Sequence, residues 1–401
     1  MSFEGVNVNQ GQGGLNRKTL STDAVMALVV VASALPGDLV NNTINVFNSL
    51  PSAEAAGINP AFDANEAILL HYHIEEFFAK APNGILKVVL TDSVKASTYF
   101  ATDAAKATFR EHTDVKRIGF VLNGAPVGLV LDDEITACQT FINDLFADKI
   151  YLNGIYLEGR NISKTALTKR TLNCGKVSVV IAQDPAIASL DPAYATYAAV
   201  GSVLGMRAAR KPNENLGSVD IIVKPDDKKG SLTFPLTDTL TGRWLSANLS
   251  DGTPVSSLSQ IDLKQLTNFG YIYAGSFQGF PGVYFNGEPT CIALTSDYSS
   301  GENNGVWDKA ALGIRNALLP KVRGWFERNP ETGFLKNTAI TDLENIGKKP
   351  LQVMRVNKEI SGYNLLIPQN QNPTDQTPLI VKASVTLGAI IHTFEVDLSL
   401  I

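Results

Sequence analysis

The sequence is poor in the residues that cross-link chains or hold metals. Its 401 residues include three cysteines and four histidines. Cys138, Cys174 and Cys291 lie far apart and form no CxxC pair, so the chain shows no disulfide framework, which fits a reducing compartment. His71 and His73 would point apart on a helix, and a shared metal would need strand geometry or outside ligands. We therefore predict no metal site.

Excess positive charge and long apolar runs are also missing. Lys and Arg total 34 against 39 Asp and Glu, a net charge of −5, whereas a dedicated nucleic-acid binder needs a basic surface. The apolar run Ala24–Leu35 is too short to span a bilayer, and it follows a polar, glycine-rich start instead of a basic leader. We expect a cytoplasmic protein without nucleic-acid or membrane partners.

Motifs that carry catalysis are absent as well. The glycines at Gly11–Gly14 follow no apolar strand and precede no GKS or GKT, so they indicate a flexible arm rather than a phosphate loop. Gly201-Ser202 and Gly275-Ser276 do not fit G-x-S-x-G, and the acidic pair Asp132-Asp133 consists of adjacent residues that cannot converge on one substrate. We predict no catalytic residue and no cofactor.

The composition is that of an ordinary globular protein, with 44% apolar and 18% charged residues. Along the chain, segments with helix patterns alternate with segments with strand patterns. Asp132–Phe146, for example, places apolar residues on one helical stripe. This alternation predicts an α/β fold, with mixed sheets and flanking helices. We divide the chain into an N-terminal arm (1–20), an α/β region (21–225), a C-terminal part of the body (226–368), and a linker with a C-terminal arm (369–401).

Both chain ends have the composition of unpaired strands. Apolar and polar residues alternate over Val381–Leu387 and again over Phe394–Leu400, with a change of phase near Gly388. The N-terminal arm could form a strand if an edge were offered. The residues that we expect to be buried by strand exchange between subunits are Phe3, Val6, Val8, Val381, Val385, Leu387, Phe394, Val396, Leu398 and Leu400. Pairing of these strands within their own chain is the simpler alternative.

Between these ends, Val306–Arg328 is predicted to be a long helix interrupted at Pro320, and Leu351–Ile367 to be extended. The helical segment carries Lys309, Arg315, Lys321 and Arg323. These cations form either a solvated face or a basic strip that meets an acidic partner.

Three segments together resemble the contractile tail sheath family, the outer jackets of phage tails and related injection machines. They are Gly279–Thr290, a glycine-rich aromatic strand before a polar loop; the long helix with Leu318-Leu319-Pro320 and the following Asn329–Leu335; and the terminal strand pair. The sequence departs from the family at Glu288-Pro289, where an arginine-like residue is common, so no role of that arginine is carried over.

The resemblance implies a structural subunit that exchanges its extended arms with neighbouring copies. Such a subunit polymerises helically around an inner tube and contracts, and it also meets baseplate and tail-terminator proteins. The four basic residues would then face the tube. It would be assembled in the cytoplasm and end in a virion or injection particle. The alternatives are another structural protein, such as a baseplate component, or an enzyme on an α/β body.

Overall fold

A seven-stranded sheet organises most of the chain. The computed structural model describes residues 22–124, 130–164, 172–374 and 376–392, together with 395, 396 and 398. The strand order is β2-β3-β1-β4-β5-β6-β9, in which β2 is antiparallel to β3 and the other neighbours are parallel. The strands are β1 (Val25–Val31), β2 (Ile44–Phe47), β3 (Ile85–Thr91), β4 (Arg117–Val121), β5 (Gly154–Glu158), β6 (Val177–Val180) and β9 (Tyr271–Ile272). Strand β1 is apolar throughout, because helices cover the sheet on both faces.

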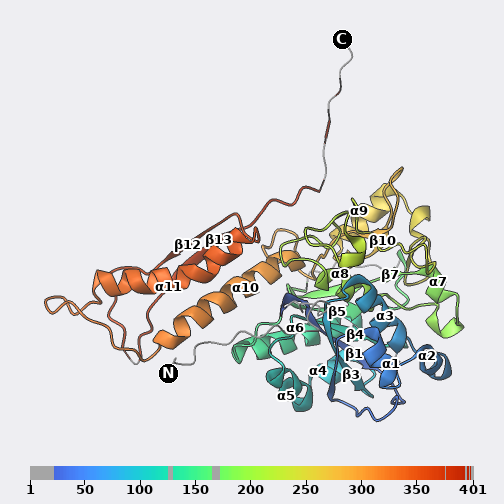
Figure 1. The fold of residues 1–401 in the computed structure, drawn as a ribbon, viewed down its shortest axis with the longest axis horizontal. Coiled ribbons are helices and arrows are strands. Elements are labelled where there is room, and N and C mark those ends of the chain that lie inside the picture. The colour runs from blue at the N-terminus through green and yellow to red at the C-terminus, as the bar shows by residue number, and fades with distance from the viewer. Residues whose placement is uncertain are drawn as a thin grey trace, which may run out of the picture.

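Helices lie on the two sides of this sheet, with α5 and α6 on one side and α1–α3 on the other (Figure 1). Helix α8 packs closely on α3: a Cβ at Gly201 would lie 2.3 Å from the His73 carbonyl oxygen. The predicted apolar stripe is confirmed in α6, which buries Ile135, Cys138, Phe141, Ile142 and Leu145. The helices are α1 (Leu50–Ala55), α2 (Pro60–Glu66), α3 (Leu70–Lys80), α4 (Ala96–Phe100), α5 (Asp103–Glu111), α6 (Leu131–Ala147), α7 (Pro185–Ala188), α8 (Val200–Ala208) and α9 (Gln260–Asn268).

Two short strand pairs complete this α/β body, which we define as residues 22–300. Strand β7 (Ala182–Gln183) pairs with β8 (Asn248–Leu249), and β10 (Ala274–Gly275) pairs with β11 (Tyr284–Phe285). The fold class predicted for the body, mixed sheets with flanking helices, is thereby confirmed. No helix among the described residues is long and apolar enough to cross a bilayer.

An elongated C-terminal lobe, residues 301–387, projects from the body (Figure 1). Helix α10 (Gly301–Leu318) runs away from the body, and α11 (Asn337–Val356) returns beside it. Strands β12 (Gly362–Leu366) and β13 (Lys382–Thr386) form an antiparallel pair that packs on these helices. The lobe thus provides its own sheet and its own helical layer.

The apolar core is divided between body and lobe. The large cluster of buried apolar residues runs from Ala24 to Cys291, and two smaller clusters contain only residues from Val306 onward. Leu351 and Leu365 lie in one small cluster, and Ile340 and Ile367 in the other. The division of the core therefore falls between Cys291 and Val306, whereas the sequence led us to place divisions at residues 225 and 368.

Two predicted elements differ from the structure. The α-helix expected over Val306–Arg328 begins earlier and ends at Leu318, because Pro320 has no N–H to continue the hydrogen-bond ladder; a 3-10 turn, η6 (Leu319–Lys321), follows. The stretch expected to be extended over Leu351–Ile367 is instead the end of α11 followed by β12. The strand predicted at Val381–Leu387 is confirmed as β13.

Candidate functional site

In the part of the chain that the structure describes, strand β13 has one unpaired edge. Its sheet has two strands, and within the described residues only β12 pairs with β13. An unpaired edge presents N–H and C=O groups that can bond to another strand. Beside β13 lies a groove of about 830 Å³, whose opposite wall is α10. That wall is mainly apolar, with Val306, Trp307, Ala310, Ala311 and Ile314. The groove is also lined by Asn303 of α10 and by Asp297 and Tyr298.

The two sides of β13 explain the alternation in its sequence. Val381 and Val385 are partly buried against the apolar cluster of the lobe. Lys382, Ser384 and Thr386 are exposed. Strand β13 therefore completes a sheet of its own chain, so Val381 and Val385 are committed to that chain's core. Leu387 is 38% exposed and lines the groove.

The remaining candidates for strand exchange lie at the two chain ends. Val396 and Leu398 are 80% and 87% exposed, which leaves large apolar side chains in water. Phe3, Val6, Val8, Phe394 and Leu400 lie outside the described residues. For these, strand exchange stays a prediction.

The four basic candidates do not form one strip. Lys309 lies at the root of the lobe, where its ammonium group contacts Asp23 at 2.6 Å and Glu359 at 2.8 Å. Arg315 is half-buried near the end of α10. Lys321 and Arg323 are exposed beyond the end of the α-helix. Within the described residues no ion pair holds these last three cations, so they are available to an outside carboxylate.

The tip of the lobe, residues 319–336, carries an apolar feature that the sequence analysis missed. Trp325 is 85% exposed and Val322 is 64% exposed, between Lys321, Arg323 and Arg328. Tryptophan beside arginine is typical of residues that anchor protein interfaces. The signal in the sequence was a tryptophan inside a basic segment, Lys321–Arg328.

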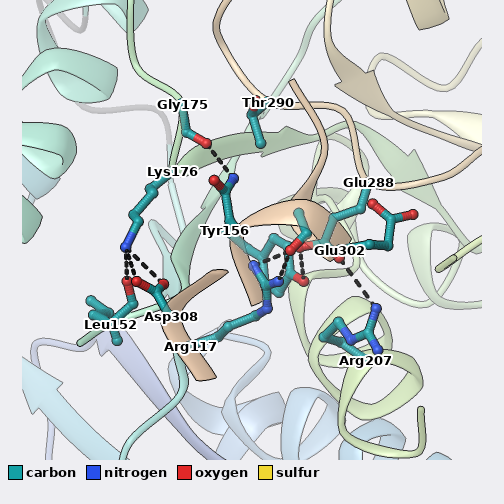
Figure 2. A network of polar contacts seen from close by, with 12 residues as sticks. Arg117, Leu152, Tyr156, Gly175, Lys176, Arg207, Glu288, Thr290, Glu302 and Asp308 are labelled. Atoms are coloured by element: carbon teal, nitrogen blue, oxygen red, sulfur yellow. Dashed lines mark hydrogen bonds and ion pairs between the residues drawn. The ribbon is translucent and has the colours of Figure 1, made fainter. Parts of the chain in front are cut away.

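A buried polar cluster lies where the lobe joins the body (Figure 2). The Glu288 carboxylate, 1% exposed as a residue, contacts Arg117 Nη1 at 2.6 Å and Arg207 Nη1 at 3.5 Å, and it accepts a hydrogen bond from the Tyr156 hydroxyl at 2.7 Å. Glu302 lies beside it on α10 and accepts a hydrogen bond from Asn215. Burial, and then repulsion by Glu288, raise the pKa of Glu302 to about 7. In the sequence, Glu288 stands out only as a departure from the family pattern.

The histidines on α3 have separate surroundings. The His71 ring lies 3.1 Å from a Glu54 carboxylate oxygen, and His73 Nδ1 accepts a hydrogen bond from the Gly201 N–H. Burial lowers the pKa of His73 to about 3, so this ring is neutral. In the described part of the chain, no group of three or more His, Cys, Asp or Glu residues could hold a metal ion.

The chain is similar to one described family and to several solved structures. Residues 3–288 match the family described as DUF2586, N-terminal domain. A chain of the contracted helical sheath of the anti-feeding prophage is 12% identical, with a TM-score of 0.59 over 100% of this chain and 99% of that one. A chain of the contracted sheath complex of PVC, an extracellular contractile injection system, is 12% identical, with a TM-score of 0.56 over 100% and 98%.

A chain of the anti-feeding prophage baseplate is equally similar, with 12% identity and a TM-score of 0.58 over 100% and 99%. No curated protein matches the chain. At this identity the structural matches show the fold alone. They cover the full length of this chain, whereas the family model covers residues 3–288. The predicted resemblance to contractile sheath proteins is therefore confirmed for the fold, including the α/β body that carried no sequence signal.

Proposed function

Because this chain belongs to the DUF2586 family and has the fold of contractile sheath proteins, we propose that it is a sheath subunit. It polymerises helically around an inner tube and contracts to drive that tube through a target envelope. The observation that carries the proposal is the unpaired edge of β13 beside an apolar groove, on a lobe that projects from the body. An edge of this kind accepts a strand from another molecule by β-augmentation. The role is mechanical, not catalytic.

The occupant of the groove in this proposal is the C-terminal segment Phe394–Leu400 of a second copy. Its strict alternation would place four apolar side chains toward the wall formed by α10. Its other face carries Glu395 and Asp397, whose charge complements the exposed Lys382 of β13. The N-terminal arm lacks this alternation and fits the edge less well.

Side-chain burial must provide the affinity of this contact. Backbone hydrogen bonds contribute about 0.5–1.5 kcal/mol each, and ordering the strand costs about 1–2 kcal/mol per residue, so these terms nearly cancel. Burying a large apolar side chain contributes about 1.5–3 kcal/mol. Val396 and Leu398 are mostly exposed in their own chain, so nearly all of that gain is available to the exchanged contact.

Electron microscopy of the purified chain tests the proposal. Filaments or tubes are expected from the full chain, and deletion of residues 388–401 should leave a folded protein that does not polymerise. This deletion spares β13, which the lobe needs for its own core. Ala311→Arg, which fills the groove, should have the same effect, whereas Gln352→Arg on the exposed face of α11 should not. Tubes from the truncated chain would refute the strand-docking proposal.

We further propose that Arg315, Lys321 and Arg323 contact an acidic surface of the inner tube protein. The support for this proposal is that none of the three has an ion pair within the described residues, and that Lys321 and Arg323 are exposed close to Trp325 in the chain. Reversing Arg315 and Lys321 to Glu should preserve folding but prevent assembly on tubes, whereas Lys264→Glu, on the exposed face of α9 in the body, should assemble normally. Normal assembly of the double variant would contradict a tube-facing role.

A baseplate subunit is the second candidate, because one of the equally similar chains comes from a baseplate. The two candidates differ in copy number, since a sheath repeats along the tail and a baseplate occurs once. In either case we propose assembly in the cytoplasm and incorporation into a particle tail, where baseplate and tail-terminator proteins complete the contacts. Quantifying copies per particle distinguishes the candidates.

A further inference from the structure

The lobe is joined to the body mainly through polar contacts. Lys176 Nζ contacts both Asp308 oxygens at 2.7 Å, and Asn304 donates to the Gly175 carbonyl at 2.5 Å. At the far side of the joint, Lys211 donates to the Asn357 carbonyl at 2.9 Å. The apolar clusters of the two units have no residue in common. Trp307, which packs on Phe146 and Tyr298, adds an aromatic contact at this joint.

Glu288 lies at the centre of this joint. Its main-chain carbonyl accepts the N–H of Gly301, the first residue of α10, at 2.9 Å. Arg117 holds the Glu288 carboxylate with one nitrogen and the Gly301 carbonyl with the other, at 2.6 and 2.7 Å. The beginning of α10 is thus held through both the side chain and the backbone of Glu288 (Figure 2).

Packing beside this cluster is incomplete. A cavity of about 250 Å³ separates body from lobe, with Lys116 and Tyr151 on one side and Leu312 and Asn316 on the other. Apolar contacts are non-directional and tolerate sliding, whereas charge-assisted hydrogen bonds require fixed distances and angles. Directional contacts around Glu288 must therefore define how α10 leaves the body.

We propose that Glu288, Arg117 and Arg207 form a positioning cluster that fixes the angle between lobe and body. Arg117 comes from β4 and Arg207 from α8, so the cluster connects the central sheet and its covering helix to α10. The angle is a property of the single chain. Its consequence, a fixed direction for the strand-docking groove, rests on the proposed function.

Pulsed electron–electron double resonance tests this proposal on the full chain, kept dilute enough to remain monomeric. Spin labels at Ala107→Cys on α5 and Asn345→Cys on α11 report the distance between body and lobe from exposed positions. The three native cysteines are buried, and labelling the chain without the added cysteines measures their background. The parent chain should give one narrow distance distribution.

Glu288→Gln should broaden or shift that distribution, and Tyr156→Phe, which removes one hydrogen bond to Glu288 with little change in volume, should broaden it less. Asp148→Asn, which breaks the exposed pair with Arg110, is the matched control and should leave it unchanged. An unchanged distribution in folded Tyr156→Phe and Glu288→Gln would overturn the proposal. Because the measurement uses monomers, a failure to polymerise does not affect it, and an unchanged angle leaves the sheath proposal intact.

Discussion

Replacing Gly301 by alanine should destabilise the chain, although alanine is normally the better helix residue. A Cβ at Gly301 would lie 1.8 Å from Glu288 Oε1 and 1.9 Å from its carboxyl carbon, so the carboxylate must leave its position. Glu288 would then separate from Arg117 and Arg207. Breaking a buried ion pair costs about 3–5 kcal/mol. A glycine-to-alanine change within a helix gains about 0.5–1 kcal/mol, so the net loss should be about 2–4 kcal/mol.

Gly305 provides the matched control on the same helix. A Cβ there would meet Pro212 at 3.5 Å, an ordinary van der Waals distance, and neither glycine has a positive φ. Gly305→Ala should therefore be neutral or slightly stabilising. Urea denaturation of both variants, followed by far-UV circular dichroism, measures the difference in midpoint. Equal midpoints for Gly301→Ala and Gly305→Ala would refute the argument that Glu288 is held against the start of α10.

Three further predictions concern the buried groups and the lobe tip. The raised pKa of Glu302, about 7 against 4.5, means that the folded chain binds this proton more tightly than the unfolded chain. The free energy of unfolding should therefore fall by about 3 kcal/mol as pH rises from 4.5 to above 7, and urea titrations at pH 5 and pH 8 should show a smaller fall in Glu302→Gln. Gly201→Ala should lower the melting temperature strongly, because its Cβ would collide with the His73 backbone; an unchanged value would contradict the close packing of α3 on α8. Trp325→Ala should leave the melting temperature unchanged because the side chain is 85% exposed, yet reduce co-sedimentation with inner tubes; full co-sedimentation would exclude the tip from that interface.

Local periodicity made much of the fold predictable. The stripe of α6 and the alternation of β13 depend on neighbouring residues, and both are in the structure as expected. The sequence predicts extended structure from Leu351, but α11 continues to Val356 and contains Pro350, although proline interrupts most helices. Here the helix continues through it, and the ring packs where α10 has Gly313: a Cβ there would lie 2.9 Å from Pro350 Cβ. This compensation depends on Gly313 of α10, so the residues around Pro350 in the sequence do not predict it.

The buried cluster was beyond sequence reasoning for the same reason. Arg117, Arg207 and Glu288 belong to separate elements, and no spacing rule relates residues so far apart in the chain. The only local signal was Glu288 itself, the one charged residue in the segment Val283–Ile292. A charge in such a segment indicates a buried partner, but its identity depends on the tertiary structure.

The polar joint has a mechanical consequence for any assembly that pulls on the lobe. Load applied at the tip reaches the central sheet through a few short, oriented bonds at Glu288 and Asp308. An apolar contact would let the two surfaces slide past each other under sustained torque, because its energy changes little during sliding. Bonds of fixed direction instead transmit torque stiffly until they break, so under such a load the lobe and the body would turn together as one rigid unit.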